Sequence, residues 1–138
     1  MSAKAVKEKG VHVSGKRKTA IARATLRPGK GIIKINNIFL ERYGNHIARM
    51  KIMEPLLIAG DIAKNVDIDV KVNGGGVMSG AEAVRLAIGR ALAEYGGKEI
   101  KQKFLDYDWT LLVADVRFKE QRKPNDSKAR AKRQKSYR

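Results

Sequence analysis

The chain has 138 residues and a formal net charge of +16, from 30 Lys or Arg against 14 Asp or Glu. This length favours a single domain. The absence of cysteine excludes a disulfide framework, a thiolate metal site and a cysteine nucleophile. The sequence has no signal-peptide core and no run that approaches the ~20 apolar residues of a membrane span. We therefore expect a soluble, intracellular protein.

The excess positive charge lies at the two ends of the chain. Residues 1–30 carry nine Lys or Arg and one Glu, for a net charge of +8. Residues 31–115 carry eleven charges of each sign, and residues 116–138 carry ten cations against two acids, again +8. A surface adapted only for solubility would mix its signs throughout. The distribution therefore concerns binding partners rather than the fold.

The distribution of apolar residues predicts the domain organisation. Residues 1–10 show no periodic pattern, and apolar residues nearly cease after Asp115. Such segments bury too little surface to offset the entropy of ordering. We expect a flexible segment at 1–10, a globular domain at 11–115 and an extended basic tail at 116–138.

An alternating pattern from Lys18 to Arg27 predicts the first strand, because a period of two residues is typical of strands. Its apolar side is formed by Ala20, Ala22, Ala24 and Leu26. We expect Arg17, Arg23 and Arg27 in one line on the outer face. Such a line is a rigid positive stripe suited to a phosphate backbone, although a solvated basic face would look the same.

The residues after this strand predict a hairpin. Residues 27–30 fit a type II turn, with Pro at the second position and Gly at the third. Residues 31–37 follow as a second strand, so that the predicted hairpin covers 12–36. Residues 37–64 are expected to be helical in pieces, with Pro55 in the first turn of a helix.

The second half of the globular segment holds the clearest patterns. Val66–Val72 alternates and predicts a strand. The best helix covers residues 79–97, where Ser79 and Glu82 form a capping box and Gly96 supplies the C-terminal stop.

A weaker helix is expected at 98–108 and a third apolar strand region at 109–115. The chain order is then hairpin, helical linker, strand, two helices, strand and tail. Mixed strands and helices predict a two-layer α/β sandwich.

Three consecutive glycines, Gly74 to Gly76, lie between the strand and the best helix. Glycines let a backbone approach a phosphate, and a helix N-terminus attracts anions. However, no Lys follows Gly80 as the Walker pattern requires, and the third glycine of the Rossmann pattern is missing. Three interpretations stay open: a tight strand-to-helix turn, a loop that holds an RNA phosphate, and a small-molecule nucleotide site.

The cations of both ends are candidates for RNA contact. Guanidinium groups grip phosphates bidentately, and the tail cations are spread over its whole length. Phe118 and Tyr137 offer faces for stacking on bases, while the lack of Leu and Ile in the tail disfavours a membrane-surface helix. A localisation signal or a solubility tag stays open for the tail. The predicted RNA-binding residues are Lys16, Arg17, Lys18, Arg23, Arg27, Arg117, Arg122, Lys123, Lys128, Arg130, Lys132 and Arg133.

Residues suited to catalysis are few. His12 and His46 are the only histidines and are expected to be surface or packing residues. Asp67 and Asp69 share a strand face with Lys71, which favours a solvated polar face. Because no catalytic triad or metal cluster is evident, we predict no enzymatic activity, no cofactor and no metal.

Several collinear motifs give the sequence a specific resemblance. GKRKTAIAR, PGKG, GGGVMSGAEAVRLAIGRAL, DVRFKEQRKP and the ending KAR…QKSYR occur in that order. Together they resemble the universal small-subunit ribosomal protein nine family over residues 11–138. The last four residues are similar to the archaeal or eukaryotic form, whereas the bacterial pattern usually ends Ser-Lys-Arg.

The resemblance implies a fold and a function. The fold would be a ribosomal S-five domain-two-like sandwich with a left-handed β-α-β crossover, against the usual handedness. The protein would be a structural, non-enzymatic part of the small-subunit head in the cytoplasm, bound to small-subunit ribosomal RNA and to neighbouring head proteins. The family's tail reaches the peptidyl-tRNA site and touches the tRNA anticodon stem-loop. In this chain that role falls to Lys135, Tyr137 and Arg138.

Two functions of other classes stay open. A small phosphotransferase would use the glycine loop and bind Mg-ATP. A histone-like protein that packs DNA would bind duplex DNA and ribosomal RNA with comparable affinity at physiological salt.

Overall fold

A computed structural model describes residues 10–137. The predicted flexible segment 1–10 lies outside the described residues, apart from Gly10. The elements in chain order are β1 (Val11–Arg17), β2 (Ala20–Pro28), β3 (Ile33–Ile35), β4 (Ile38–Phe39), the 3-10 helix η1 (Leu40–Arg42), α1 (His46–Ala59), α2 (Asp61–Lys64), β5 (Val66–Asn73), α3 (Val77–Tyr107) and the 3-10 helix η2 (Trp109–Leu111).

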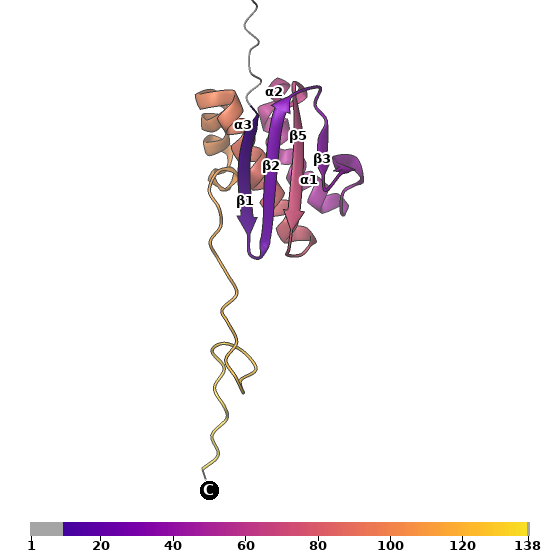
Figure 1. The fold of residues 1–138 in the computed structure, drawn as a ribbon. Helices are drawn as coiled ribbons and strands as arrows, with labels where there is room; N and C mark the ends of the chain where they lie inside the picture. Colours follow the sequence, from indigo (N-terminus) through magenta and orange to yellow (C-terminus); the bar gives the residue numbers. More distant parts are fainter. Residues whose placement is uncertain (1–9, 138) are drawn as a thin grey trace, which may run out of the picture.

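The strands form one mixed sheet in the order β1-β2-β5-β3-β4. Neighbouring strands are antiparallel except β3 and β5, which are parallel and joined through α1. The helices cover one face of the sheet and leave the other face open (Figure 1). The predicted mixed α/β class is therefore confirmed. The S-five label and the left hand of the crossover stay predictions.

The hairpin forms between other strands than the sequence predicted. β1 pairs with β2 through the two-residue turn at Lys18 and Thr19, and β5 occupies the other edge of β2. The predicted pairing of β2 with β3 is therefore wrong. The type II turn is wrong as well, since the positive φ falls at Gly31 and not at Gly29. The Pro-Gly signal is strong locally, but a strand much later in the chain takes the place beside β2.

Two helix predictions also change. Pro55 lies inside α1, not in its first turn. α3 begins at Val77 with Gly76 as N-cap and no side-chain cap, so the capping box of Ser79 and Glu82 is wrong. The carboxylate of Glu82 pairs instead with cations from β1 and α1, which outcompete the local backbone groups.

The end of the globular part is partly as predicted. Gly97 leaves the helical conformation with φ 73° and separates the two helical stretches of α3, one residue after the predicted stop. The second helix, predicted at 98–108, is confirmed and ends at Tyr107. The predicted strand at 109–115 is wrong, because this segment begins with η2, where the Asp108 carboxylate accepts a hydrogen bond from the backbone N–H of Thr110.

The core lies between the sheet and the two long helices α1 and α3. The inward side chains of β2 are small or aliphatic and fully or almost fully buried: Ala20, Ala22, Ala24 and Leu26. On β1, Gly15 approaches the α3 backbone so closely that a Cβ would lie 2.3 Å from the carbonyl oxygen of Ala83 and 2.8 Å from the nitrogen of Ala87. The small residues therefore let the helix backbone lie almost directly on the sheet.

We expect Gly15→Ala to lower the free energy of unfolding by about 1–3 kcal/mol, the usual cost of overpacking. The added methyl group meets backbone atoms of α3, which cannot rotate away. Urea unfolding followed by circular dichroism measures the change. Gly10→Ala is the matched control, because its Cβ meets nothing closer than 3.7 Å. Its free energy of unfolding should stay within about 0.5 kcal/mol of the parent value. Equal stability of the two variants would contradict the close approach.

Candidate nucleic-acid interface

The open face of the sheet carries a cluster of cations at the end of the β1–β2 hairpin. Arg23 lies between Ser14 of β1 and Lys71 of β5 in the register of the sheet. Lys16 lies two rows nearer the turn, opposite Ile21, and Lys16, Arg23 and Lys71 are exposed. Lys71 was not among the predicted residues. Its place on the polar side of a strand was visible in the sequence, but its pairing with Arg23 was not.

The opposite end of the open face is less basic. Arg27 lies opposite Asp67, and Thr25 lies opposite Asp69. The Asp67 carboxylate accepts hydrogen bonds from the backbone N–H groups of Ile32 (2.9 Å) and Lys30 (2.8 Å), which lower its pKa. The positive charge is therefore concentrated toward the hairpin turn, where Lys18 is also exposed.

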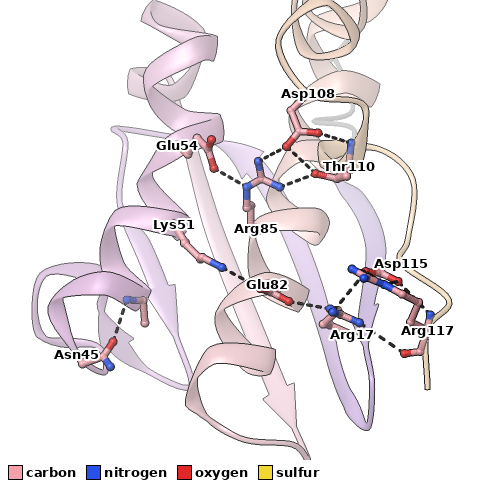
Figure 2. A network of polar contacts seen from close by, with 11 residues as sticks. Arg17, Asn45, Lys51, Glu54, Glu82, Arg85, Asp108, Thr110, Asp115 and Arg117 are labelled. Carbon is pink, nitrogen blue, oxygen red and sulfur yellow. Dashed lines mark hydrogen bonds and ion pairs between the residues drawn. The ribbon is translucent and has the colours of Figure 1, made fainter. Parts of the chain in front are cut away.

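Arg17 does not belong to the outer line that the sequence predicted. It is paired with Ala20, whose side chain is buried against the helices, so Arg17 lies on the inner face of the sheet. Its guanidinium forms ion pairs with Glu82 at 2.7 Å and with Asp115 at 3.3 Å. Glu82 also pairs with Lys51 at 2.8 Å, and Figure 2 shows this chain of contacts between β1, α3 and α1.

A second network is centred on Arg85 of α3 (Figure 2). The guanidinium binds Glu54 of α1 at 2.5 Å, Asp108 at 2.8 Å and the Thr110 hydroxyl at 2.9 Å. Tyr107 donates a hydrogen bond to Glu54, which raises the tyrosine pKa. Arg85 thus joins both long helices to the segment that leads into the tail.

The two networks line one cavity of about 380 Å³. Its charged lining residues are Lys16, Arg17, Lys51, Arg85 and Arg117 with Glu54, Glu82, Asp108 and Asp115. Most of these charges are already paired with one another. The cavity therefore resembles a structural junction more than a site for a charged ligand.

The segment after Asp115 leaves the globular part as an irregular chain (Figure 1). Phe118 lies under the Lys16 ammonium, which is 5.0 Å from the ring centroid, and Tyr137 is 88% exposed. Arg130 pairs with Glu120 at 2.8 Å. The predicted cations of this segment are exposed: Arg117, Arg122, Lys123, Lys128, Arg130, Lys132, Arg133 and Lys135. Arg138 lies outside the described residues.

The glycine loop is explained by packing. Gly74 and Gly75 have positive φ values of 73° and 72°. A Cβ at Gly74 would lie 2.8 Å from the carbonyl oxygen of Thr19, and one at Gly75 would lie 2.7 Å from the Cβ of Ala20. Both glycines are thus required where the loop crosses the β1–β2 turn, which supports the tight strand-to-helix turn among the three interpretations.

Other kinds of site find little support in residues 10–137. His12 accepts or donates a hydrogen bond at the exposed Thr25 hydroxyl, and His46 begins α1. No group of three His, Asp or Glu side chains in this part of the chain could hold a metal ion. Nor does any helix there combine the length and apolar character that a membrane crossing needs.

Comparison with known proteins then decides the family. A family model described as ribosomal protein S9/S16 matches residues 15–138. The chain belongs to this family. It is 52% identical over 133 residues to the small ribosomal subunit protein uS9 of Methanococcus maripaludis strain C7, covering 94% of this chain and 99% of that protein. The uS9 protein of Methanococcus vannielii is 51% identical with the same coverage.

Membership of the S9/S16 family confirms the resemblance seen in the sequence. The archaeal relatives agree with the predicted archaeal or eukaryotic type. The proteins of this family are ribosomal, so that the chain is a structural protein and not an enzyme. Phosphotransferase activity is therefore no longer a candidate.

Because the ion-pair networks around Arg17 and Arg85 contain carboxylates, we expect the protein to lose stability in acid. Burial acts to raise the pKa of Glu82, but hydrogen bonds from Lys51 and Arg17 outweigh it and lower the pKa. Burial likewise opposes a lowered pKa at Asp108, where bonds from Thr110 and Arg85 prevail. Their ionised forms therefore stabilise the fold above the unfolded pKa of about 4, and this contribution is lost as pH falls through the lower folded-state values.

We expect Arg85→Met to lower the free energy of unfolding at pH 7 by about 1.5–3 kcal/mol and to weaken its dependence on acid, because Asp108 loses its cation. Urea titrations at pH 7, 5 and 3 measure both effects. Arg90→Met is the control, since Arg90 donates only to the carbonyl groups of Leu112 and Ser14. Arg90→Met should lower the free energy of unfolding, but this free energy should still fall in acid as it does in the parent protein. Full acid dependence in Arg85→Met would contradict the assignment.

Proposed function

We propose that the chain is a structural constituent of the small ribosomal subunit that binds small-subunit ribosomal RNA in the head. The observation that carries this proposal is the 52% identity over almost the full length of an archaeal protein named as a small ribosomal subunit protein. The charge distribution agrees with it, because phosphate neutralisation needs cations that a phosphate can reach. Work in the ribosome also implies a cytoplasmic location and contacts with neighbouring head proteins.

The proposed RNA contacts lie on the hairpin end of the open sheet face and along the tail. These cations are exposed, and the tail runs far from the globular part (Figure 1), as a segment that follows an RNA groove would. Lys71 is added because it lies opposite Arg23. The proposed residues are Lys16, Lys18, Arg23, Arg27, Lys71, Arg117, Arg122, Lys123, Lys128, Arg130, Lys132 and Arg133.

The tip of the tail is proposed to contact the anticodon stem-loop of the tRNA in the peptidyl site. Lys135 and Arg138 would bind phosphates, and the exposed ring of Tyr137 would stack on a base or sugar. The terminal carboxylate offsets part of the Arg138 charge. The tip would therefore adjust the grip on tRNA rather than supply most of its affinity.

The test of ribosomal function is sedimentation of the tagged protein from a cell lysate on sucrose gradients, before and after a high-salt wash. We expect the protein to stay with the small subunit through the wash, because an integral ribosomal component is enclosed in the assembled particle and does not depend only on phosphate contacts, which high salt weakens. Release of the protein as a free species, or sedimentation with chromosomal DNA, would contradict the proposal and favour the DNA-packing alternative.

Deletion of Ser136–Arg138 should weaken tRNA retention in the peptidyl site by about 10-fold or more, because one charge-assisted contact alone contributes about 1.5–3 kcal/mol, and should leave subunit assembly intact. Filter binding of tRNA to purified subunits and gradient profiles measure the two effects. Lys98→Gln, which removes one positive charge from α3, is the matched control and should change neither. A failure of assembly in the deletion would show that the tip is structural.

A further inference from the structure

Arg17 of β1 uses all three guanidinium nitrogens, on partners in α3 and in the segment 115–117. Its Nε donates to the Glu82 carboxylate of α3 at 2.7 Å. One terminal nitrogen lies 3.3 Å from the Asp115 carboxylate, and the other donates to the backbone carbonyl of Arg117 at 3.5 Å. Arg17 therefore connects the end of β1 with α3 and with the first residues of the tail (Figure 2).

The tail side of this junction is held by further contacts. Asp115 accepts hydrogen bonds from the Arg117 backbone N–H at 3.0 Å and from its guanidinium at 2.6 Å, so the turn at 115–117 is closed on itself. Bonds from Arg117 hold the Asp115 pKa far below its usual range, and the carboxylate stays charged at physiological pH. The Phe118 ring then lies beneath the ammonium of Lys16. We call Lys16, Arg17, Glu82, Asp115 and Phe118 the tail clamp.

The surroundings of Arg17 are those of a structural cation. Its side chain is 15% exposed and has two carboxylates as partners, so that a phosphate would have to displace an acid to reach it. Arg23, only three strand rows away on the opposite face, is exposed and has no ion pair among residues 10–137. The two arginines of the motif GKRKTAIAR thus have different chemical surroundings.

We propose that Arg17 and Asp115 are positioning residues, which fix the base of the tail before RNA binds and so set the direction in which the tail leaves the domain. The tail begins beside β1 and passes the hairpin turn, which is the basic end of the open sheet face, before it leaves the domain (Figure 1). Fixing its first residues in advance lowers the entropy cost of binding. The benefit to RNA binding rests on the function proposed above. The existence of the tail clamp does not depend on that function.

The clamp is tested first on the full-length protein without RNA. Because the chain has no cysteine, Val116→Cys, an exposed position, accepts a single nitroxide label at the base of the tail, and Ser127→Cys reports on the middle of the tail. Arg17→Lys keeps the charge but loses the three-way fork, and Asp115→Asn removes the acid while Glu82 still partners Arg17. We expect a several-fold faster label motion at 116 in both variants and no change at 127.

The second measurement is the affinity for a transcript of small-subunit ribosomal RNA, at several salt concentrations. Asp115→Asn makes the protein more positive, which by charge alone should strengthen binding. We expect it to weaken binding several-fold instead, without a change in the salt slope. Asp106→Asn, which makes the same charge change on α3 away from the clamp, should bind at least as well as the parent. Arg23→Gln should reduce the slope by about 0.7–0.9, as the loss of one phosphate contact does.

These outcomes separate the clamp from the ribosomal function. Unchanged label motion at 116 in Asp115→Asn would overturn the clamp, and melting curves would show whether Arg17→Lys still folds. Tighter RNA binding by Asp115→Asn would overturn the positioning role. A further variant, Arg17→Gln, removes the charge of Arg17. If Arg17→Lys binds RNA normally and Arg17→Gln has a smaller salt slope, Arg17 is a phosphate contact and the positioning role is likewise overturned. If the parent protein does not bind the transcript, the proposed function fails while the label motion still decides the clamp.

Discussion

The close approach of α3 to the β1–β2 hairpin is the constraint on which the rest of the molecule depends. Gly15 and the alanines of β2 leave no side chain large enough to hold the helix backbone away. This dense contact covers one face of the sheet and leaves the other open. It also brings Glu82 of α3 to Arg17 at the end of β1. Packing of small residues thus places both the exposed basic face and the junction from which the tail departs.

The neutral charge of the central part has a structural explanation. Four of its acids, Glu54, Glu82, Asp108 and Asp115, are partners of cations that join helices, sheet and tail base. These pairs hold the globular part together, and several of them are half-buried. The cations of the hairpin end and of the tail are largely left without such partners in the described residues, and they are the charges that an RNA backbone can neutralise.

The sequence predicted most elements but only part of the proposed interface. Alternation found β2 and β5, and helical spacing found α3, because these signals are local. The prediction that Arg17, Arg23 and Arg27 form one line assumed a single continuous strand, in which residues at odd positions share a face. The turn at Lys18 and Thr19 interrupts that count, since Arg17 is paired with Ala20 and takes its inner face. The turn lacks the glycine or asparagine that usually marks a tight hairpin.

By itself the sequence determined the family, the mixed α/β class, the neutral centre with two basic ends and the exposed cations of the tail, because composition and collinear motifs carry these properties without reference to contacts. The tertiary structure decided which strands pair, where Lys71 lies, and that Arg17 has acids rather than solvent around it. Each of these depends on residues far apart in the chain, which no local pattern relates. The insertion of β5 between β2 and β3 decides the strand pairing and the place of Lys71, and the packing of α3 on β1 decides the surroundings of Arg17.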